Sequence, residues 1–257
     1  MAFQLAACAE MLWRDRPISW RASRLKDMGF GVGLWNWTDW DVTALERTGA
    51  TFTIMNGYLK GRLTDKDGAA ALLKSARETA IIGKRLGVQR LNLHGTGLGD
   101  LGLPIPHLAS FAPGMEIRAR DTLHRICDLA EELDVTFTLE NLNLREHPGC
   151  PFNSTAAVLS LVSAVNRPRL RINLDLYHTQ IGEGDVIRWA EACLPWIGEI
   201  QVADNPGRCE PGTGEMNWPS IARALDAMGY NGPVGMEAYA AKEPEAALEA
   251  FRAAFTV

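Results

Sequence analysis

The chain has 257 residues, of which 47% are hydrophobic and 22% charged, so its composition is that of an ordinary globular protein and gives no reason to expect disorder. A chain of this length can bury roughly three quarters of its surface in one domain. Its formal charge of −5 argues against a nucleic-acid partner, because phosphate binding needs a clustered basic surface. We therefore expect one domain over residues 1–257.

The cysteines and the N-terminus indicate the compartment. The five cysteines are spread without a close CxxC pair, so neither a disulfide framework nor a thiolate zinc site is expected. The first residues, MAFQLAACAE, reach an acid at Glu10 before any apolar run long enough for a signal peptide or a membrane span. We expect a cytoplasmic protein with no membrane partner.

Short apolar runs of strand character alternate with longer amphipathic stretches along the whole chain. Eight strands are expected, and they begin at Phe3, Gly31, Thr51, Arg90, Thr136, Leu170, Ile197 and Pro233. The sixth is expected to run through LRINLDLYH. This alternation predicts a parallel α/β fold, and eight strands with ~250 residues favour a (β/α)8 TIM barrel.

The intervening stretches have helical periodicity, and several begin with Asp, Ser or Asn or end at Gly. Helices are expected over 66–86, 115–133, 155–165, 185–193, 218–228 and 244–255, with a short one after Asp41. The Gly/Pro-rich stretches 95–113 and 205–214 are expected to be long loops at the carboxyl ends of the strands, where this architecture places active sites. A doubly wound open sheet is the alternative, but no GxGxxG follows the first strand.

Each of the last four expected strands has a polar residue near its carboxyl end, where a buried strand would otherwise be apolar. These residues are Glu140, Asp175, Gln201 and Glu237. Consecutive strand ends of a barrel converge on one axial site, and three carboxylates held together without a cation would repel one another. Carboxylate and amide oxygens suit Mg²⁺ or Mn²⁺, with Co²⁺ or Zn²⁺ as alternatives. The alternative for any one residue is a strand cap or a buried ion pair with arginine.

Further polar residues fall where a substrate would lie. His178, Glu146 and Arg208 follow the strand ends closely and can bind hydroxyls or a carboxylate. His94 closes the fourth strand and either approaches substrate or bonds the following loop, while Arg145 is either a substrate ligand or a solvated loop residue.

Tryptophans cluster after the first two strands. They are Trp13, Trp35, Trp37 and Trp40, and three of them fall in WNWTDWD. Aromatic walls in sugar sites exclude water and stack on the carbon skeleton, so this segment is expected to form a pocket wall or a subunit contact, and Trp35 is a candidate substrate contact. Ordinary packing is the alternative for each indole.

With these residues the sequence resembles the hydroxypyruvate isomerase family of the xylose isomerase-like TIM barrel superfamily. The segments that carry the resemblance are ENLNLREHPG, NLDLYHTQIGEGD, IGEIQVADNPGRCEPGTGEMNW and GYNGPVGMEAY. The chain departs from the family where Asn141 replaces the usual proline, and in GLWNWTDWD and LNLHGTGLGDLG of the N-terminal half.

The resemblance implies one divalent metal ion bound by Glu140, Asp175, Gln201 and Glu237, with both glutamates also acting as acid and base. It implies substrate binding by Glu146, His178 and Arg208. The expected reaction is isomerisation of a small hydroxy-carbonyl sugar or sugar acid through an enediolate, and Gln201 favours this branch over the related epimerases, which have a histidine there.

The same ligands would also serve a ketose 3-epimerase or a β-eliminating lyase. Two alternatives from other classes are an endonuclease IV-like phosphodiesterase, against which the five histidines and the negative charge count, and a non-catalytic sugar-binding protein. The expected partner is a small molecule, and a homo-oligomer, dimer or tetramer, is left open.

Overall fold

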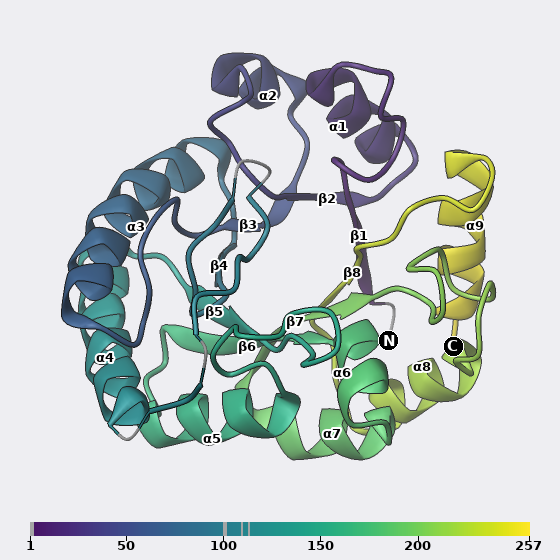
Figure 1. The fold of residues 1–257 in the computed structure, drawn as a ribbon. Helices are drawn as coiled ribbons and strands as arrows, with labels where there is room; N and C mark the ends of the chain where they lie inside the picture. The colour runs from purple at the N-terminus through teal and green to yellow at the C-terminus, as the bar shows by residue number, and fades with distance from the viewer. Residues whose placement is uncertain (1–2, 100–101, 109, 113) are drawn as a thin grey trace.

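The computed structural model describes residues 3–99, 102–108, 110–112 and 114–257. Eight parallel strands pair in chain order and β8 returns to pair with β1, so the sheet closes into a barrel (Figure 1). The strands are β1 (Gln4–Cys8), β2 (Gly31–Leu34), β3 (Phe52–Asn56), β4 (Arg90–Leu93), β5 (Phe137–Glu140), β6 (Leu170–Asp175), β7 (Ile197–Val202) and β8 (Pro233–Met236). The predicted TIM barrel is confirmed.

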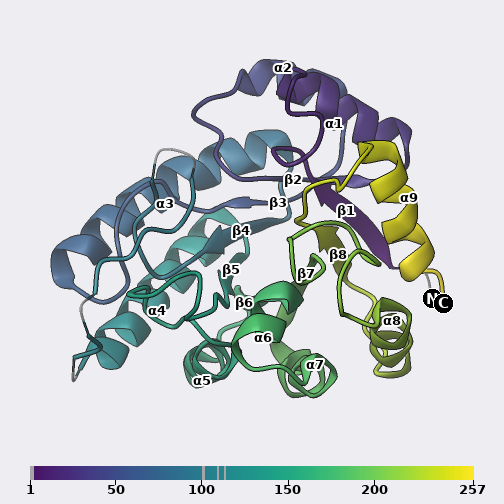
Figure 2. The same ribbon diagram turned by 45° about the vertical axis from the view of Figure 1, so that its right-hand side comes forward.

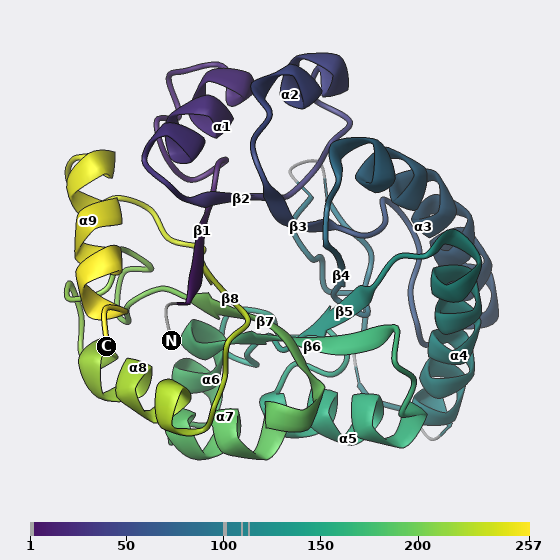
Figure 3. The same cartoon turned by 180° about the vertical axis from the view of Figure 1, so that it is seen from behind.

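The helices form an outer ring around the strands, which is clearest from behind in Figure 3. They are α1 (Ile18–Asp27), α2 (Val42–Thr48), α3 (Lys66–Leu86), α4 (Met115–Leu133), α5 (Thr155–Val165), α6 (Leu176–Gly182), α7 (Val186–Cys193), the 3₁₀ turn η1 (Leu194–Trp196), α8 (Trp218–Ala227) and α9 (Pro244–Ala254). Local signals fix several ends: the Asp65 side chain accepts from Gly68 N at the start of α3, and Gly87 ends it with φ of 68°. No helix in the described part of the chain is both long and apolar enough to span a membrane.

The sixth strand is shorter than the sequence predicted. We expected it to continue through His178, but it ends at Asp175, and α6 begins at the next residue. The Asp175 side chain accepts hydrogen bonds from Tyr177 N at 2.8 Å and His178 N at 3.1 Å, so it caps this helix. The apolar pattern of Leu176 and Tyr177 suits either a strand or a buried helix turn. The hydrogen bonds from the backbone to the Asp175 side chain stabilise the helix. Helix α1 occupies the place between β1 and β2 that the alternation requires, although its bounds were not predicted.

The carboxyl ends of the strands are covered by the loops that follow them. The stretch 205–214 lies between β7 and α8, as expected, and 95–113 lies between β4 and α4, although residues 100, 101, 109 and 113 of that loop fall outside the described residues. Figure 2, turned by 45°, shows α6 next to β6 and β7, inside the outer ring to which α5 and α7 belong. These loops and α6 therefore surround the end of the barrel at which the polar strand residues emerge.

Candidate active site

The strand register brings three of the predicted polar residues together. Glu140 pairs with Asn173 across β5 and β6, and Asp175 pairs with Gln201 across β6 and β7. All three predicted side chains are at most 5% exposed. The ligand atoms of Glu140, Asp175 and His178 lie within 4.8 Å of one another, a spacing that can hold a metal ion. The structure therefore contains a buried carboxylate and histidine group at the carboxyl ends of β5 and β6.

Two buried asparagines orient this group, and the sequence reasoning missed both. Asn173 donates through Nδ2 to Glu140 Oε2 at 3.0 Å and to Gln201 Oε1 at 2.8 Å. Asn92, on β4, donates to the same Glu140 oxygen and accepts from Thr138 Oγ1 at 2.9 Å. Because hydrogen bonds to an ionised carboxylate are strong and directional, these amides fix the rotamer of Glu140. Asn173 also links Gln201 to the carboxylate group.

The fourth predicted residue, Glu237, follows β8 directly and is held from two sides. Trp35 Nε1 donates to Glu237 Oε1 at 2.7 Å, and the Arg208 guanidinium forms an ion pair with Oε2. The guanidinium also lies over the Tyr177 ring at 5.1 Å, which fixes its plane. Arg208 has a φ of 51°, a conformation that non-glycine residues seldom adopt, so the backbone here is strained to place this side chain. Trp35 and Arg208, two of the predicted substrate contacts, thus both contact Glu237.

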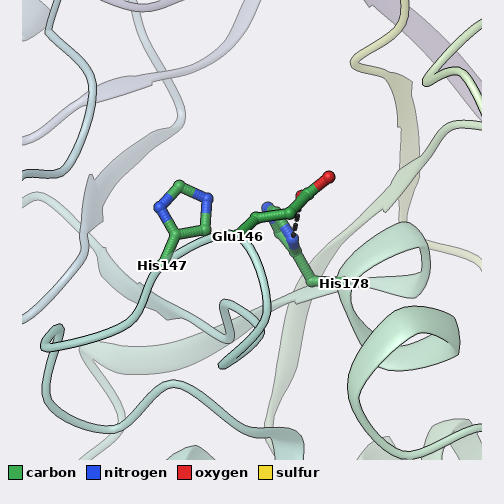
Figure 4. A group of neighbouring side chains, drawn as sticks. All are labelled: Glu146, His147 and His178. Atoms are coloured by element: carbon green, nitrogen blue, oxygen red, sulfur yellow. Dashed lines mark ion pairs between the residues drawn. The ribbon is translucent and has the colours of Figure 1, made fainter.

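His178 and Glu146, two further predicted substrate ligands, lie beside the carboxylate group. His178 Nε2 is 3.7 Å from Asp175 Oδ2 and 4.0 Å from Glu140 Oε1. Its Nδ1 is 2.6 Å from Asn143 Nδ2, and because an amide nitrogen donates, Nε2 carries the proton that faces the carboxylates. Figure 4 marks the approach of His178 Nδ1 to Glu146 Oε2 at 3.8 Å, and because burial lowers the pKa of His178 well below its ordinary value, the imidazole is neutral and this contact is not an ion pair.

A second group that can hold a metal ion shares this histidine. Its members are Glu146, His147 and His178, and the His147 and His178 rings meet edge to face at 5.3 Å. Tyr177 Oη donates to Glu146 Oε1 at 2.7 Å, so Glu146 stays near the histidines although it is more exposed than the strand residues. His147 was not predicted from the sequence, and its position one residue after Glu146 is the only signal that pointed to it.

The remaining candidates differ in their positions. His94 Nε2 is 3.3 Å from Glu140 Oε2, so His94 faces the site, whereas Arg145 is exposed and has no recorded contact with the site residues among those described. Trp37 packs against the core and donates to Thr79 Oγ1 at 3.2 Å. Trp35 and Trp40 line a pocket beside the site, so this part of WNWTDWD is a pocket wall.

Burial and charge act in opposite directions on the carboxyl groups. Burial raises the pKa of Asp175 to about 8 against the lowering effect of Arg208, and Glu140 and Glu237 add smaller increases. Burial likewise raises the pKa of Glu237 above its ordinary value. For Glu140 burial also acts upward, but His94, Arg208 and Asn92 outweigh it and hold its pKa below the usual range. Since the carboxylates repel one another, a bound divalent cation would stabilise their ionised forms, and this oxygen-rich set fits such an ion.

Asn141, which stands where the resembled family has proline, joins two of the strand ends. Its Oδ1 accepts from Asp175 N at 2.8 Å, and its Nδ2 donates to Asp175 O at 3.0 Å and to Thr179 Oγ1 at 3.1 Å. Asn141 is fully buried, so these bonds are shielded from water. The substitution therefore supplies a side-chain link between the end of β5 and the end of β6, which a proline could not make.

The sequence profile of the xylose isomerase-like TIM barrel family matches residues 42–255. The chain belongs to that family. Curated relatives include the 2-oxo-tetronate isomerase of Cupriavidus necator, 33% identical over 51% of this chain and 52% of that protein, and the hydroxypyruvate isomerase of Escherichia coli, 33% identical over 46% and 45%. The alignments span about half the length of these relatives.

Solved structures have the same barrel over nearly the whole chain. One titled AP endonuclease, family 2, from Brucella melitensis superposes with a TM-score of 0.83 at 25% identity, covering 96% of this chain and 97% of that one. The 3-keto-D-glucoside 4-epimerase YcjR of E. coli gives 0.77 at 20% identity, covering 98% and 97%. At 20% identity, the similarity to the epimerase establishes the shared fold and nothing further.

Proposed function

We propose that this chain is a metal-dependent isomerase that interconverts the aldehyde and ketone forms of a small hydroxy-carbonyl compound, a short sugar or a hydroxypyruvate-like sugar acid. The observation that carries the proposal is the buried set of carboxylates and amides at the ends of β5 to β8. The isomerase names of the curated relatives support it, as does membership of the family.

The residues that would hold the metal are Glu140, Asp175, Gln201 and Glu237. Their three carboxylates and one amide oxygen suit Mg²⁺ or Mn²⁺, with Co²⁺ or Zn²⁺ as alternatives. When bound, such an ion supplies Lewis-acid polarisation of the substrate carbonyl and acidifies the neighbouring C–H. Asn173 would orient the two oxygen ligands that it contacts, Glu140 and Gln201.

The two glutamates would act as the acid and the base. Glu140 is oriented by two amides and by His94, and Glu237 by Trp35 and Arg208, so each carboxyl group is fixed at one position. One removes the proton from the hydroxyl-bearing carbon next to the carbonyl, the proton of that hydroxyl passes to the former carbonyl oxygen, and the same or the other glutamate returns a proton to the former carbonyl carbon. Fixed general bases of this kind need little reorganisation during proton transfer.

The remaining predicted residues would bind substrate hydroxyls. His178, His94 and Glu146 present nitrogen and oxygen atoms at the edge of the carboxylate group. The Trp35 indole would exclude water on the side of Glu237, while Arg208 would bind either a substrate oxygen or Glu237. We propose a cytoplasmic enzyme whose partner is this small molecule and not a nucleic acid; a dimer or tetramer remains a prediction.

Proton NMR of three- to six-carbon keto-sugars and keto-acids in D₂O, with Mg²⁺ added, tests the proposal. Deuterium at the carbon next to the carbonyl, together with a product whose carbonyl has moved by one carbon, is the expected result. A product inverted at one carbon would assign a 3-epimerase, and loss of a substituent a lyase. Binding without exchange would assign a sugar-binding protein, and cleavage of abasic-site DNA an endonuclease; either result would overturn the proposed isomerase.

A further inference from the structure

A pocket of about 280 Å³ lies beside the candidate site, on the other side of Trp35. Its wall residues are Glu10, Arg14, Arg21, Trp35, Asn36, Asp39, Trp40, Leu103 and Tyr239. Trp35 also lines the cavity inside the barrel that contains Gln201 and Glu237. One indole therefore separates the two spaces, and none of the roles proposed above uses the pocket.

Two segments connect the walls of the pocket with the site. Trp35 donates from its indole to Glu237 and from its backbone N to Glu10 Oε1 at 2.9 Å. Tyr239 stands two residues after Glu237, and its backbone N donates to Arg208 O at 2.9 Å. A molecule held at Glu237 thus needs to extend only past the Trp35 indole to enter the pocket.

The polar groups of the pocket differ in their availability. The Arg21 guanidinium is not available to a ligand, because it donates to the backbone oxygens of Arg16, Ala9 and Arg14 at 2.7, 3.2 and 2.8 Å. The Arg14 guanidinium lies 5.8 Å from the Tyr239 ring and has no hydrogen bond or ion pair among the described residues. Arg14 is therefore the available cation of this pocket.

The acceptors of the pocket are acidic. Glu10 accepts from Trp35 N and from Cys8 Sγ, which leaves lone pairs on both oxygens, and Asp39 is exposed. The buried Trp40 indole nitrogen also interacts with the Glu10 carboxyl group, so it is not a free donor for a ligand. A hydroxyl group can accept from Arg14 and donate to a carboxylate oxygen, so it suits both kinds of group in the pocket.

We propose that this pocket binds the hydroxylated end of a substrate longer than three carbons, with Arg14 and Glu10 as its hydrogen-bonding groups and Trp35 and Tyr239 as its aromatic faces. The inference rests on the proposed function, because it assumes that the reacting carbonyl lies at Glu237. A three-carbon substrate would leave the pocket empty. The preferred substrate is then a hydroxy-carbonyl compound of four or more carbons with free hydroxyls at the end remote from the carbonyl.

The test compares kcat/KM for hydroxypyruvate with kcat/KM for four- and five-carbon substrates that react. Arg14→Gln and Tyr239→Ala should each lower the ratio of long to short substrate about fivefold to tenfold, mainly through KM, since each loses one hydrogen-bonding or stacking contact. Arg16→Gln is the matched control, because Arg16 lies over Trp20 and does not line the pocket. It should leave the ratio unchanged. Equal losses for short and long substrates, or no loss, would overturn the inference.

A binding measurement separates this inference from the proposed reaction. Xylitol and glycerol are titrated into the Mg²⁺-loaded protein and followed by saturation-transfer NMR. Xylitol should bind at least fivefold tighter than glycerol, and both pocket variants should remove that difference while Arg16→Gln retains it. If no compound of any length is turned over, the proposed function fails, but this result still supports the pocket assignment. Equal binding of the two polyols to the unmodified protein, or a difference that survives in the variants, refutes it.

Discussion

Replacing Asn141 by leucine tests the link between the ends of β5 and β6. The variant keeps roughly the same shape but removes the bonds to Asp175 N, Asp175 O and Thr179 Oγ1. Asp175 O keeps Thr179 Oγ1 as a donor at 2.8 Å, so only Asp175 N–H is left buried and unpaired. An orphaned donor costs about 1–3 kcal/mol and the other lost bonds about 1 kcal/mol, so the free energy of unfolding should fall by about 2–4 kcal/mol.

Urea unfolding of the protein in EDTA measures this loss without any contribution from a bound ion. Thr155→Val is the graded comparison, because it removes one weaker partner of Asn141, at 3.3 Å, and the Thr155 bond to Thr179 Oγ1, at 3.0 Å, but leaves Asp175 N–H paired, and it should cost about 1–2 kcal/mol. Since Asp175 is a proposed metal ligand, Asn141→Leu should also weaken Mn²⁺ binding about tenfold to a hundredfold. An unfolding free energy within about 1 kcal/mol of the unmodified protein would refute the reasoning about the orphaned N–H.

Four further predictions follow from the site and the barrel interior. Glu140→Gln or Glu237→Gln should keep the fold and lower kcat by more than the ~10²- to 10⁴-fold expected for acid-base catalysis, since each is also a proposed ligand; retained turnover in both would reject the assignment. Asn173→Leu should lower Mn²⁺ affinity or kcat/KM about tenfold to a hundredfold, measured by calorimetry and kinetics, and unchanged values would show that its two bonds do not orient the ligands. EDTA should lower the Tm by about 5 to 10 °C relative to protein with Mg²⁺ at a hundred times its Kd, and an unchanged Tm would contradict a specific site. Burial raises the pKa of Glu199 from 4.5 to about 7, so in EDTA this group should contribute about 3 kcal/mol to a loss of stability as the pH rises through that range; Glu199→Gln should reduce the slope in urea unfolding by that amount and leave the part due to Asp175, whose pKa is also raised, and an unchanged slope would exclude Glu199 as a source.

The sequence predicted the barrel and the four strand-end residues because both depend on local patterns. Eight apolar runs fix the number of strands, and a polar residue at the end of a buried run is conspicuous at Glu140 or Gln201. Asn173 carried the same signal inside a strand, two residues before Asp175, and period-2 alternation places both on one face. The position of Asn173 in the strand therefore indicates a side chain on the same face as Asp175.

Other features depend on contacts between distant segments. Trp35 and Glu237 are separated by 202 positions, so their hydrogen bond follows only from the closure of β8 onto β1 beside β2. Glu10 ended an apolar run in the sequence, and only the fold reveals its contact with Trp35 N. The predicted end of β6 was wrong because Asp175 has two roles. It is the last residue of the strand, and its side chain also caps α6. Spacing alone does not separate these two roles.

The most direct test of the central claim is solvent exchange at the substrate carbon next to the carbonyl, followed by proton NMR in D₂O for the EDTA-treated protein before and after Mg²⁺ is restored. We predict exchange and a shifted carbonyl only with the ion present, and neither in Glu140→Gln or Glu237→Gln. Exchange that is independent of the ion, or that proceeds at the unmodified rate in both glutamine variants, would contradict the proposed metal site and its acid-base pair.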